Sequence, residues 1–141
     1  MSFPAVNYLA VLVAAFAIWI LGALWYSKAL FAKRWMALMG KSEADLKASA
    51  AEGSPMPILL GLAFACSLAS AWALAVLLNH FPPVTLLRAA LLGLLCWLGF
   101  AAPTSFATAM FSQQPKGLWL INSGYNAVSF VIAALILAVW R

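Results

Sequence analysis

Four long apolar segments separated by short polar joints make up nearly the whole of this 141-residue chain. At about 1.5 Å of rise per residue, each is long enough to cross a hydrocarbon core about 30 Å thick. Only 8% of the residues are charged, whereas a soluble domain typically has about 25%. The sequence therefore predicts an all-α integral membrane protein, a single domain over residues 1–141 with four transmembrane helices in an antiparallel bundle. The predicted spans cover about residues 8–26, 56–78, 89–111 and 118–140.

Basic residues are distributed unequally between the two sides of the predicted bundle. The joints at residues 27–55 and 112–117 carry six Lys and Arg, whereas the opposite side carries only Arg88 and Arg141. Because an excess of Lys and Arg marks the cytoplasmic side, we predict a multi-pass topology with the joint 27–55 in the cytoplasm and both termini outside it. No basic stripe with interleaved aromatic residues runs along a soluble surface, so membrane lipids are the predicted partners and nucleic acid is not.

The joint 27–55 is predicted to contain a short amphipathic helix that lies in the membrane interface. Its apolar residues share one broad arc of a helical wheel, with two basic residues away from the centre of that arc, which suits a Trp at headgroup level. A docking or lipid-sensing element is the alternative. Gly40 is placed to end this helix, and Ser42 with Asp45 resembles a capping box that begins a second one. The candidate interfacial residues are Phe31, Lys33, Arg34 and Trp35.

Polar side chains inside the predicted spans are informative because the bilayer makes them costly. Four of them on span four are spaced to share one helix face, and two Thr on span three lie at similar depth. Pro103 removes a helical donor, frees the carbonyl of Gly99 for nearby Thr and Asn donors, and predicts a helix kink. The cluster forms either interhelical hydrogen bonds, worth about 0.6–2 kcal/mol each, or a polar pocket. Its predicted members are Asn122, Tyr125, Asn126, Ser129, Thr104 and Thr108.

Small residues recur at intervals of four on span two, which predicts a seam that another helix approaches closely. The sequence leaves open whether that helix belongs to the same bundle or to a second protomer. Aromatic residues near the span ends, among them Trp25, Tyr26, Trp119 and Trp140, are predicted to be interface anchors. The members of the packing seam are Ala63, Ser67, Ala71 and Ala75.

Residues that could carry chemistry are few. His80 is the single histidine, next to the Pro82-Pro83 turn, and Cys66 and Cys96 lie in separate spans without CxxC spacing. All three carboxylates lie in the joint 27–55, which leaves none in the membrane to relay protons or bind a cation. We therefore expect no catalytic residues, no metal site and no cofactor.

Short motifs spread over nearly the full length follow one order: Asn7, residues 22–27 with their Trp-Tyr pair, Pro103-Thr104, and Asn122 with Gly124-Tyr125. In this order they resemble a family of small four-span bacterial membrane proteins, classed as a domain of unknown function (seventeen sixty-one in the usual series). The resemblance implies a four-helix fold in the bacterial inner membrane. It implies no activity, because the family carries no established one.

Two kinds of function are compatible with these features, and the sequence favours the first, with the second as its alternative. The first is a structural role, in which the chain associates with itself or serves as an accessory subunit of a larger membrane complex. The second is a binder or carrier of a small neutral or lipid-like molecule that uses the polar face of spans three and four. The chain also resembles the four-span membrane glutathione and eicosanoid enzymes, but residues 56–78 lack the charged residues of that family's second helix. We therefore expect the protein not to be an enzyme.

Overall fold

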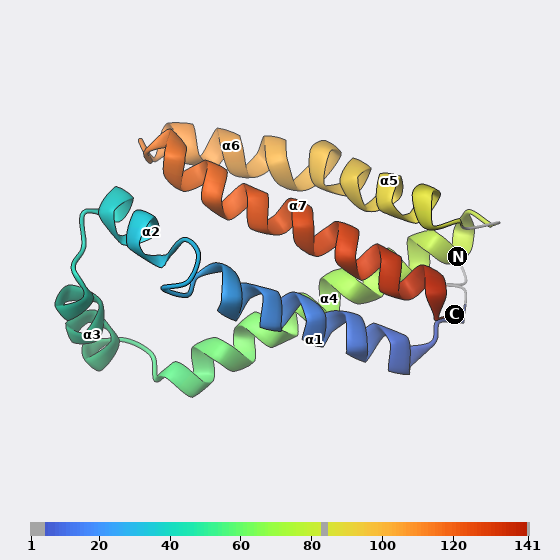
Figure 1. The fold of residues 1–141 in the computed structure, drawn as a ribbon, viewed down its shortest axis with the longest axis horizontal. Helices are drawn as coiled ribbons and strands as arrows, with labels where there is room; N and C mark the ends of the chain where they lie inside the picture. Colours follow the sequence, from blue (N-terminus) through green and yellow to red (C-terminus); the bar gives the residue numbers. More distant parts are fainter. Residues whose placement is uncertain (1–4, 83–84, 141) are drawn as a thin grey trace.

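The computed structural model describes residues 5–82 and 85–140, and all regular structure within them is helical (Figure 1). Four helical stretches, Tyr8–Trp25, Met56–His80, Leu86–Phe111 and Lys116–Val139, are long and apolar enough to cross a membrane, which confirms the predicted all-α, four-span character. The elements in chain order are α1 (Tyr8–Trp25), α2 (Ala32–Met39), α3 (Glu43–Glu52), α4 (Met56–His80), α5 (Leu86–Cys96), the π-helical segment η1 (Trp97–Ala101), α6 (Ala102–Phe111) and α7 (Lys116–Val139).

Local capping explains where the helices begin and end. The Asn7 side chain accepts hydrogen bonds from the first turn of α1, and Gly40 ends α2 in the left-handed conformation. The third span begins at Leu86, three residues before the prediction, because the Thr85 hydroxyl caps α5 through the Arg88 N–H. The second span likewise extends two residues past the prediction, to His80. Pro83, part of the predicted turn, lies outside the described residues.

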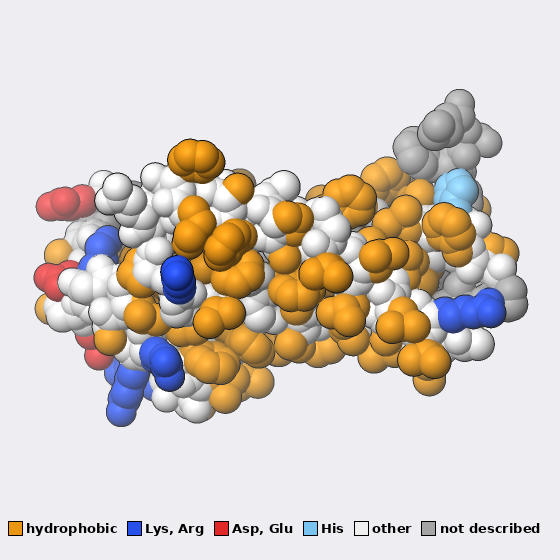
Figure 2. All heavy atoms as spheres, turned by 90° about the horizontal axis from the view of Figure 1, so that it is seen from above, with side chains coloured by type: hydrophobic (Ala, Val, Ile, Leu, Met, Phe, Trp, Pro, Cys, Tyr) orange, Lys and Arg blue, Asp and Glu red, His pale blue; other side chains and the backbone are white. Residues whose placement is uncertain are grey.

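The four long helices run up and down the long axis, and both termini lie at one end of the molecule (Figure 1). Helix α7 is central, since it packs against α1, α4 and α5, while α4 makes little contact with α5. The connecting helices α2 and α3 lie at the opposite end. Figure 2 shows hydrophobic side chains over the middle of the molecule and most of its visible charged side chains at the α2–α3 end.

The packed core lies where α1, α4, α5 and α7 meet, and small residues dominate it. Three members of the predicted seam, Ser67, Ala71 and Ala75, are buried on α4, whereas Ala63 is exposed. The seam therefore packs within the bundle over three of its four positions. The closest approach is between α5 and α7, where a Cβ on Gly93 would stand 2.6 Å from the Phe130 carbonyl oxygen.

Helical geometry changes directly before Pro103. Residues 97–101 form a π-helical turn, in which the Ala102 N–H donates to the Trp97 carbonyl. Such insertions accommodate a proline inside a long helix and occur often at functional sites. The sequence predicted that Thr and Asn donors would reach the Gly99 carbonyl. Instead, the Thr104 hydroxyl donates to the carbonyls of Phe100 and Ala101.

Candidate functional site

Helices α1 and α7 interlock through two glycines that each receive an aromatic ring from the other helix. A Cβ on Gly22 would stand 3.1 Å from the Tyr125 hydroxyl oxygen, and one on Gly124 would stand 3.3 Å from the Trp25 ring. The two helices approach closely here because neither glycine presents a side chain. Several of the residues that carry the family resemblance thus meet in one place.

Hydrogen bonds reinforce this junction. The Trp25 indole donates to the Ile121 carbonyl at 3.0 Å, and the Tyr125 hydroxyl donates to the Ile18 carbonyl at 3.0 Å. The Tyr26 hydroxyl donates to Oδ1 of Asn122 at 2.8 Å. Trp25 and Tyr26, predicted to be interface anchors, therefore direct their polar groups into the protein. The reason is that carbonyl and amide acceptors on α7 lie within their reach.

A groove of about 370 Å³ lies between α6 and α7, beside this junction. It brings together four members of the predicted polar cluster, two from each helix. The other two members do not line it: Tyr125 turns toward α1, and Ser129 is buried. All side chains that line this α6–α7 groove are uncharged. They are Thr104, Ser105, Thr108, Ala109, Gln114, Trp119, Asn122, Ser123 and Asn126.

The polar groups of the α6–α7 groove are only partly committed to one another. The Trp119 indole donates to the Ser105 hydroxyl at 3.0 Å, and the Thr108 hydroxyl donates to the carbonyl of Thr104. These bonds leave acceptor capacity on the hydroxyl oxygens. Asn126 is half-buried, and its amide makes no hydrogen bond with another residue in the part of the chain that the structure describes. The groove thus presents neutral donors and acceptors to an occupant.

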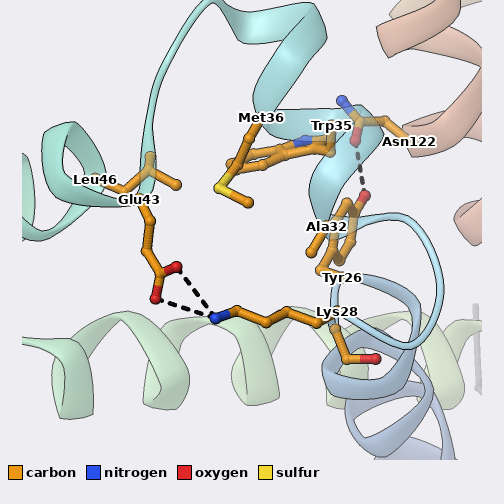
Figure 3. A pocket seen from close by; sticks show the side chains of 9 residues that line it. Tyr26, Lys28, Ala32, Trp35, Met36, Glu43, Leu46 and Asn122 are labelled. Carbon is orange, nitrogen blue, oxygen red and sulfur yellow. Dashed lines mark hydrogen bonds and ion pairs between the residues drawn. The ribbon is translucent and has the colours of Figure 1, made fainter.

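A second hollow, of about 600 Å³, lies between α2, α3 and the residues that follow α1 (Figure 3). We call it the joint pocket. Figure 3 shows Trp35 and Met36 on one side of it, Lys28 with Glu43 on another, and Tyr26 with Asn122 at a third. Asn122 therefore lines both this pocket and the α6–α7 groove. The lining residues are Tyr26, Ser27, Lys28, Ala32, Trp35, Met36, Glu43, Leu46 and Asn122.

Helix α2 is held against the bundle by its apolar residues. Phe31 packs on Trp25 with ring centroids 4.8 Å apart, and Trp35 meets Tyr26 edge to face at 5.9 Å. A Cβ on Gly117 of α7 would stand 3.2 Å from the Leu38 side chain. The predicted basic pair, Lys33 and Arg34, is exposed. The apolar arc of this helix is therefore used, at least at these positions, to contact protein.

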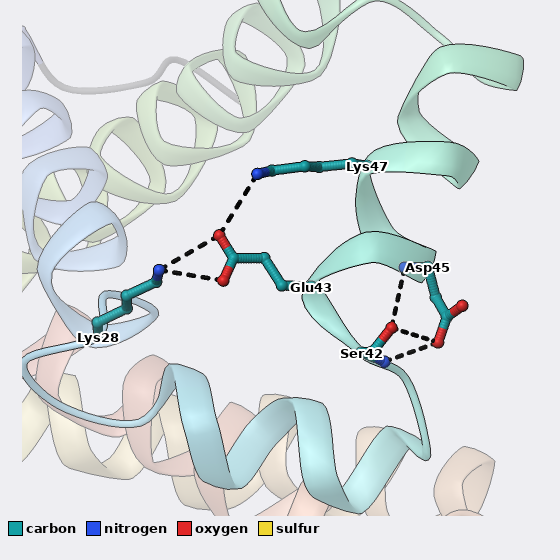
Figure 4. Close-up of polar contacts among 5 residues, drawn as sticks. All are labelled: Lys28, Ser42, Glu43, Asp45 and Lys47. Carbon is teal, nitrogen blue, oxygen red and sulfur yellow. Dashed lines mark hydrogen bonds and ion pairs between the residues drawn. The ribbon is translucent and has the colours of Figure 1, made fainter.

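Charged groups border the joint pocket at α3 (Figure 4). Glu43 lies between two lysines: its Oε2 is 3.1 Å from Lys28 Nζ, and its Oε1 is 3.6 Å from Lys47 Nζ. The hydrogen bond from Lys28, together with its charge, lowers the pKa of Glu43. The predicted capping box is confirmed, since the Asp45 N–H donates to the Ser42 hydroxyl at 3.1 Å and the Ser42 N–H donates to Asp45 at 2.8 Å.

Comparison with known protein families identifies a family that matches this chain. Residues 9–138 match the family described as "Protein of unknown function (DUF1761)". The chain belongs to this family. The match covers nearly the whole sequence and confirms the resemblance that the ordered motifs indicate. The chain matches no curated protein and no solved structure.

Membership of the DUF1761 family assigns no chemistry to these sites, so their residues must be judged by geometry. Within the described residues, no group of three His, Cys, Asp or Glu could hold a metal ion. His80 ends α4, where its Nδ1 lies 2.9 Å from the Val76 carbonyl oxygen. Cys96 is buried and Cys66 is exposed.

Sequence reasoning missed several groove residues of this DUF1761 protein. Gln114 and Trp119 lie near the turn that joins α6 and α7, and Ser123 accepts a hydrogen bond from the Trp97 indole at 3.1 Å. The spacing of Trp119, Ser123 and Asn126 along one helix would have identified a wider polar face. No pattern in the sequence indicates the joint pocket, because it depends on how α2 and α3 are placed around the end of α1.

Proposed function

We propose that this protein binds a small neutral or lipid-like molecule in the α6–α7 groove. The single observation that supports this function is the half-buried Asn126 amide, which faces a groove lined wholly by uncharged side chains and has no described hydrogen-bond partner. A purely structural polar face would be expected to pair its amides across the helices, since an unpaired amide at membrane depth is costly. An uncharged ligand with hydroxyl or carbonyl groups supplies the missing partner.

The proposed setting is the bacterial inner membrane. There the four long helices cross as an antiparallel bundle, with α2 at the cytoplasmic interface and both termini outside. The concentration of Lys and Arg at the α2–α3 end supports this orientation. In a variant without the native cysteines, Ser49→Cys should react with an impermeant thiol reagent only after the cells are opened, and Phe81→Cys should react in intact cells. Labelling of Ser49→Cys in intact cells would reverse the topology.

Binding is tested with Asn126→Leu, which keeps a similar volume and removes both the donor and the acceptor. The probe is monoolein, an uncharged lipid with two hydroxyls, titrated into the protein in maltoside micelles. We expect wild type and the matched variant Val128→Leu, on the same helix but outside the groove, to bind monoolein alike. Asn126→Leu should lose binding while its melting temperature stays close to wild type.

A structural, oligomeric or accessory-subunit role without catalysis is the alternative. In that case Asn126→Leu should change the free energy of unfolding by about 1 kcal/mol and no more. Monoolein should then bind wild type and Asn126→Leu equally weakly, which would exclude the proposed function for this class of ligand. Oligomer size in micelles, measured by light scattering on the same samples, reports directly on self-association.

A further inference from the structure

We propose that the joint pocket is a second binding site, which takes a single-chain amphiphile with an anionic head. This inference goes beyond the proposed function and concerns a different part of the molecule. The two sites differ in charge, because the α6–α7 groove is lined by neutral groups alone, whereas two charged residues line the joint pocket.

The walls of the joint pocket suit an apolar chain. Ala32, Trp35 and Met36 from α2 and Leu46 from α3 present apolar surface to a hollow of about 600 Å³, a volume within the range of about 300–1,000 Å³ that small-molecule sites occupy. The aromatic wall is fixed, since Trp35 packs edge to face on Tyr26 and the Tyr26 hydroxyl is bonded to Asn122. The pocket is therefore preformed on that side.

The charges at its edge suit an anion. Lys28 and Lys47 both contact Glu43, so the three groups together carry one net positive charge. The Lys28 and Lys47 side chains are 68% and 78% exposed, and such exposed ion pairs contribute only about 0–1 kcal/mol. An ammonium has three donors and can contact Glu43 and a second anion together. A bound anionic head would therefore not have to break a strong interaction.

The position of the pocket matches an amphiphile as well. It lies at the α2–α3 end, where the apolar surface of the bundle gives way to charged side chains (Figure 2). Figure 3 shows the apolar Trp35 and Met36 facing the Lys28–Glu43 pair across the hollow. One molecule with an apolar chain and a charged head satisfies both walls, whereas a free inorganic anion would leave the apolar wall without a partner.

The experiment measures binding of hexadecyl phosphate to the full chain in maltoside micelles. Hexadecanol and inorganic phosphate, which represent the apolar chain and the anionic head of this amphiphile, are measured separately. We expect hexadecyl phosphate to bind more tightly than either part. Lys28→Met should raise its Kd by roughly tenfold or more, since a hydrogen bond to a charged group is lost. Glu43→Gln should lower the Kd, because the competing carboxylate is removed. Lys33→Met, with the same change of charge outside the pocket, should leave the Kd unchanged.

A purely structural ion pair would be weakened by Lys28→Met and by Glu43→Gln alike. Opposite effects of the two variants on the Kd for hexadecyl phosphate therefore indicate a binding site. The inference is overturned if the two variants shift the Kd in the same direction. It is also overturned if, in the Asn126→Leu background where the α6–α7 groove does not contribute, hexadecanol or inorganic phosphate binds as tightly as the intact amphiphile. An equal loss with Lys33→Met would also overturn it, because the effect would then be one of net charge. Asn126→Leu should not change the Kd for hexadecyl phosphate, so this site and the α6–α7 groove can fail independently.

Discussion

The two ends of the bundle are held together by different means. At the end that carries the termini, small side chains from four helices fill the core, among them Ala10, Ala14, Ala71 and Ala133, all at 0% exposure. Toward the α2–α3 end, aromatic side chains hydrogen-bond across elements, as Trp25, Tyr26 and Trp119 do. Both hollows with polar linings that we assign to ligands lie in this second region.

The difference shows how a small membrane protein can combine a rigid support with an open site. Alanine and glycine let helix backbones approach closely, and the core that they form is closely packed. At the aromatic end, rings pack between the elements, and their indole and hydroxyl groups satisfy backbone carbonyls in the absence of water. The two hollows lined by Asn122 lie beside these rings.

The largest expected effect on stability comes from disrupting the packing of α5 against α7 at the close-packed end. Gly93→Leu places a side chain where even a Cβ would stand 2.6 Å from the Phe130 carbonyl oxygen, so α5 and α7 must separate. We expect a loss of about 3 kcal/mol or more in the free energy of unfolding, measured by denaturant titration in micelles. Gly61→Leu is the control, because nothing lies within 4 Å of a Cβ at that position. Equal stability of the two variants would show that α5 and α7 are not in contact.

A smaller loss is expected from the seam on α4. Ala71 is fully buried, whereas Ala63, two turns away on the same seam, is exposed. Ala71→Leu should therefore cost about 1–3 kcal/mol through overpacking, and Ala63→Leu should cost little. If Ala63→Leu instead changes the oligomer size seen by light scattering, the exposed end of the seam contacts a second protomer.

The sequence predicts the close-packed end better than the aromatic end. Apolar length locates the four spans, and the spacing of Ala71 and Ala75 identifies their packing face. Helical periodicity and depth place Thr104, Asn122 and Asn126 in one polar cluster, and these three residues line the α6–α7 groove. However, helical periodicity does not show which acceptor a long side chain contacts. A Trp near a span end can turn toward headgroups or toward a carbonyl, and only the neighbouring helix decides which.

The smallest expected effect tests whether an aromatic side chain that turns toward a carbonyl stabilises the protein. Tyr125→Phe removes the hydroxyl that donates to the Ile18 carbonyl and leaves the ring against Gly22. We expect a loss of about 0.6–1.7 kcal/mol, which runs from the average to the maximum measured for hydrogen bonds between membrane helices. Tyr8→Phe is the matched control, since Tyr8 is 73% exposed and its ring makes no contact at the junction. If the two changes cost the same, the Tyr125 hydroxyl does not help to hold α1 and α7 together. A loss confined to Tyr125→Phe would show that its hydroxyl helps to hold α1 and α7 together beside the α6–α7 groove.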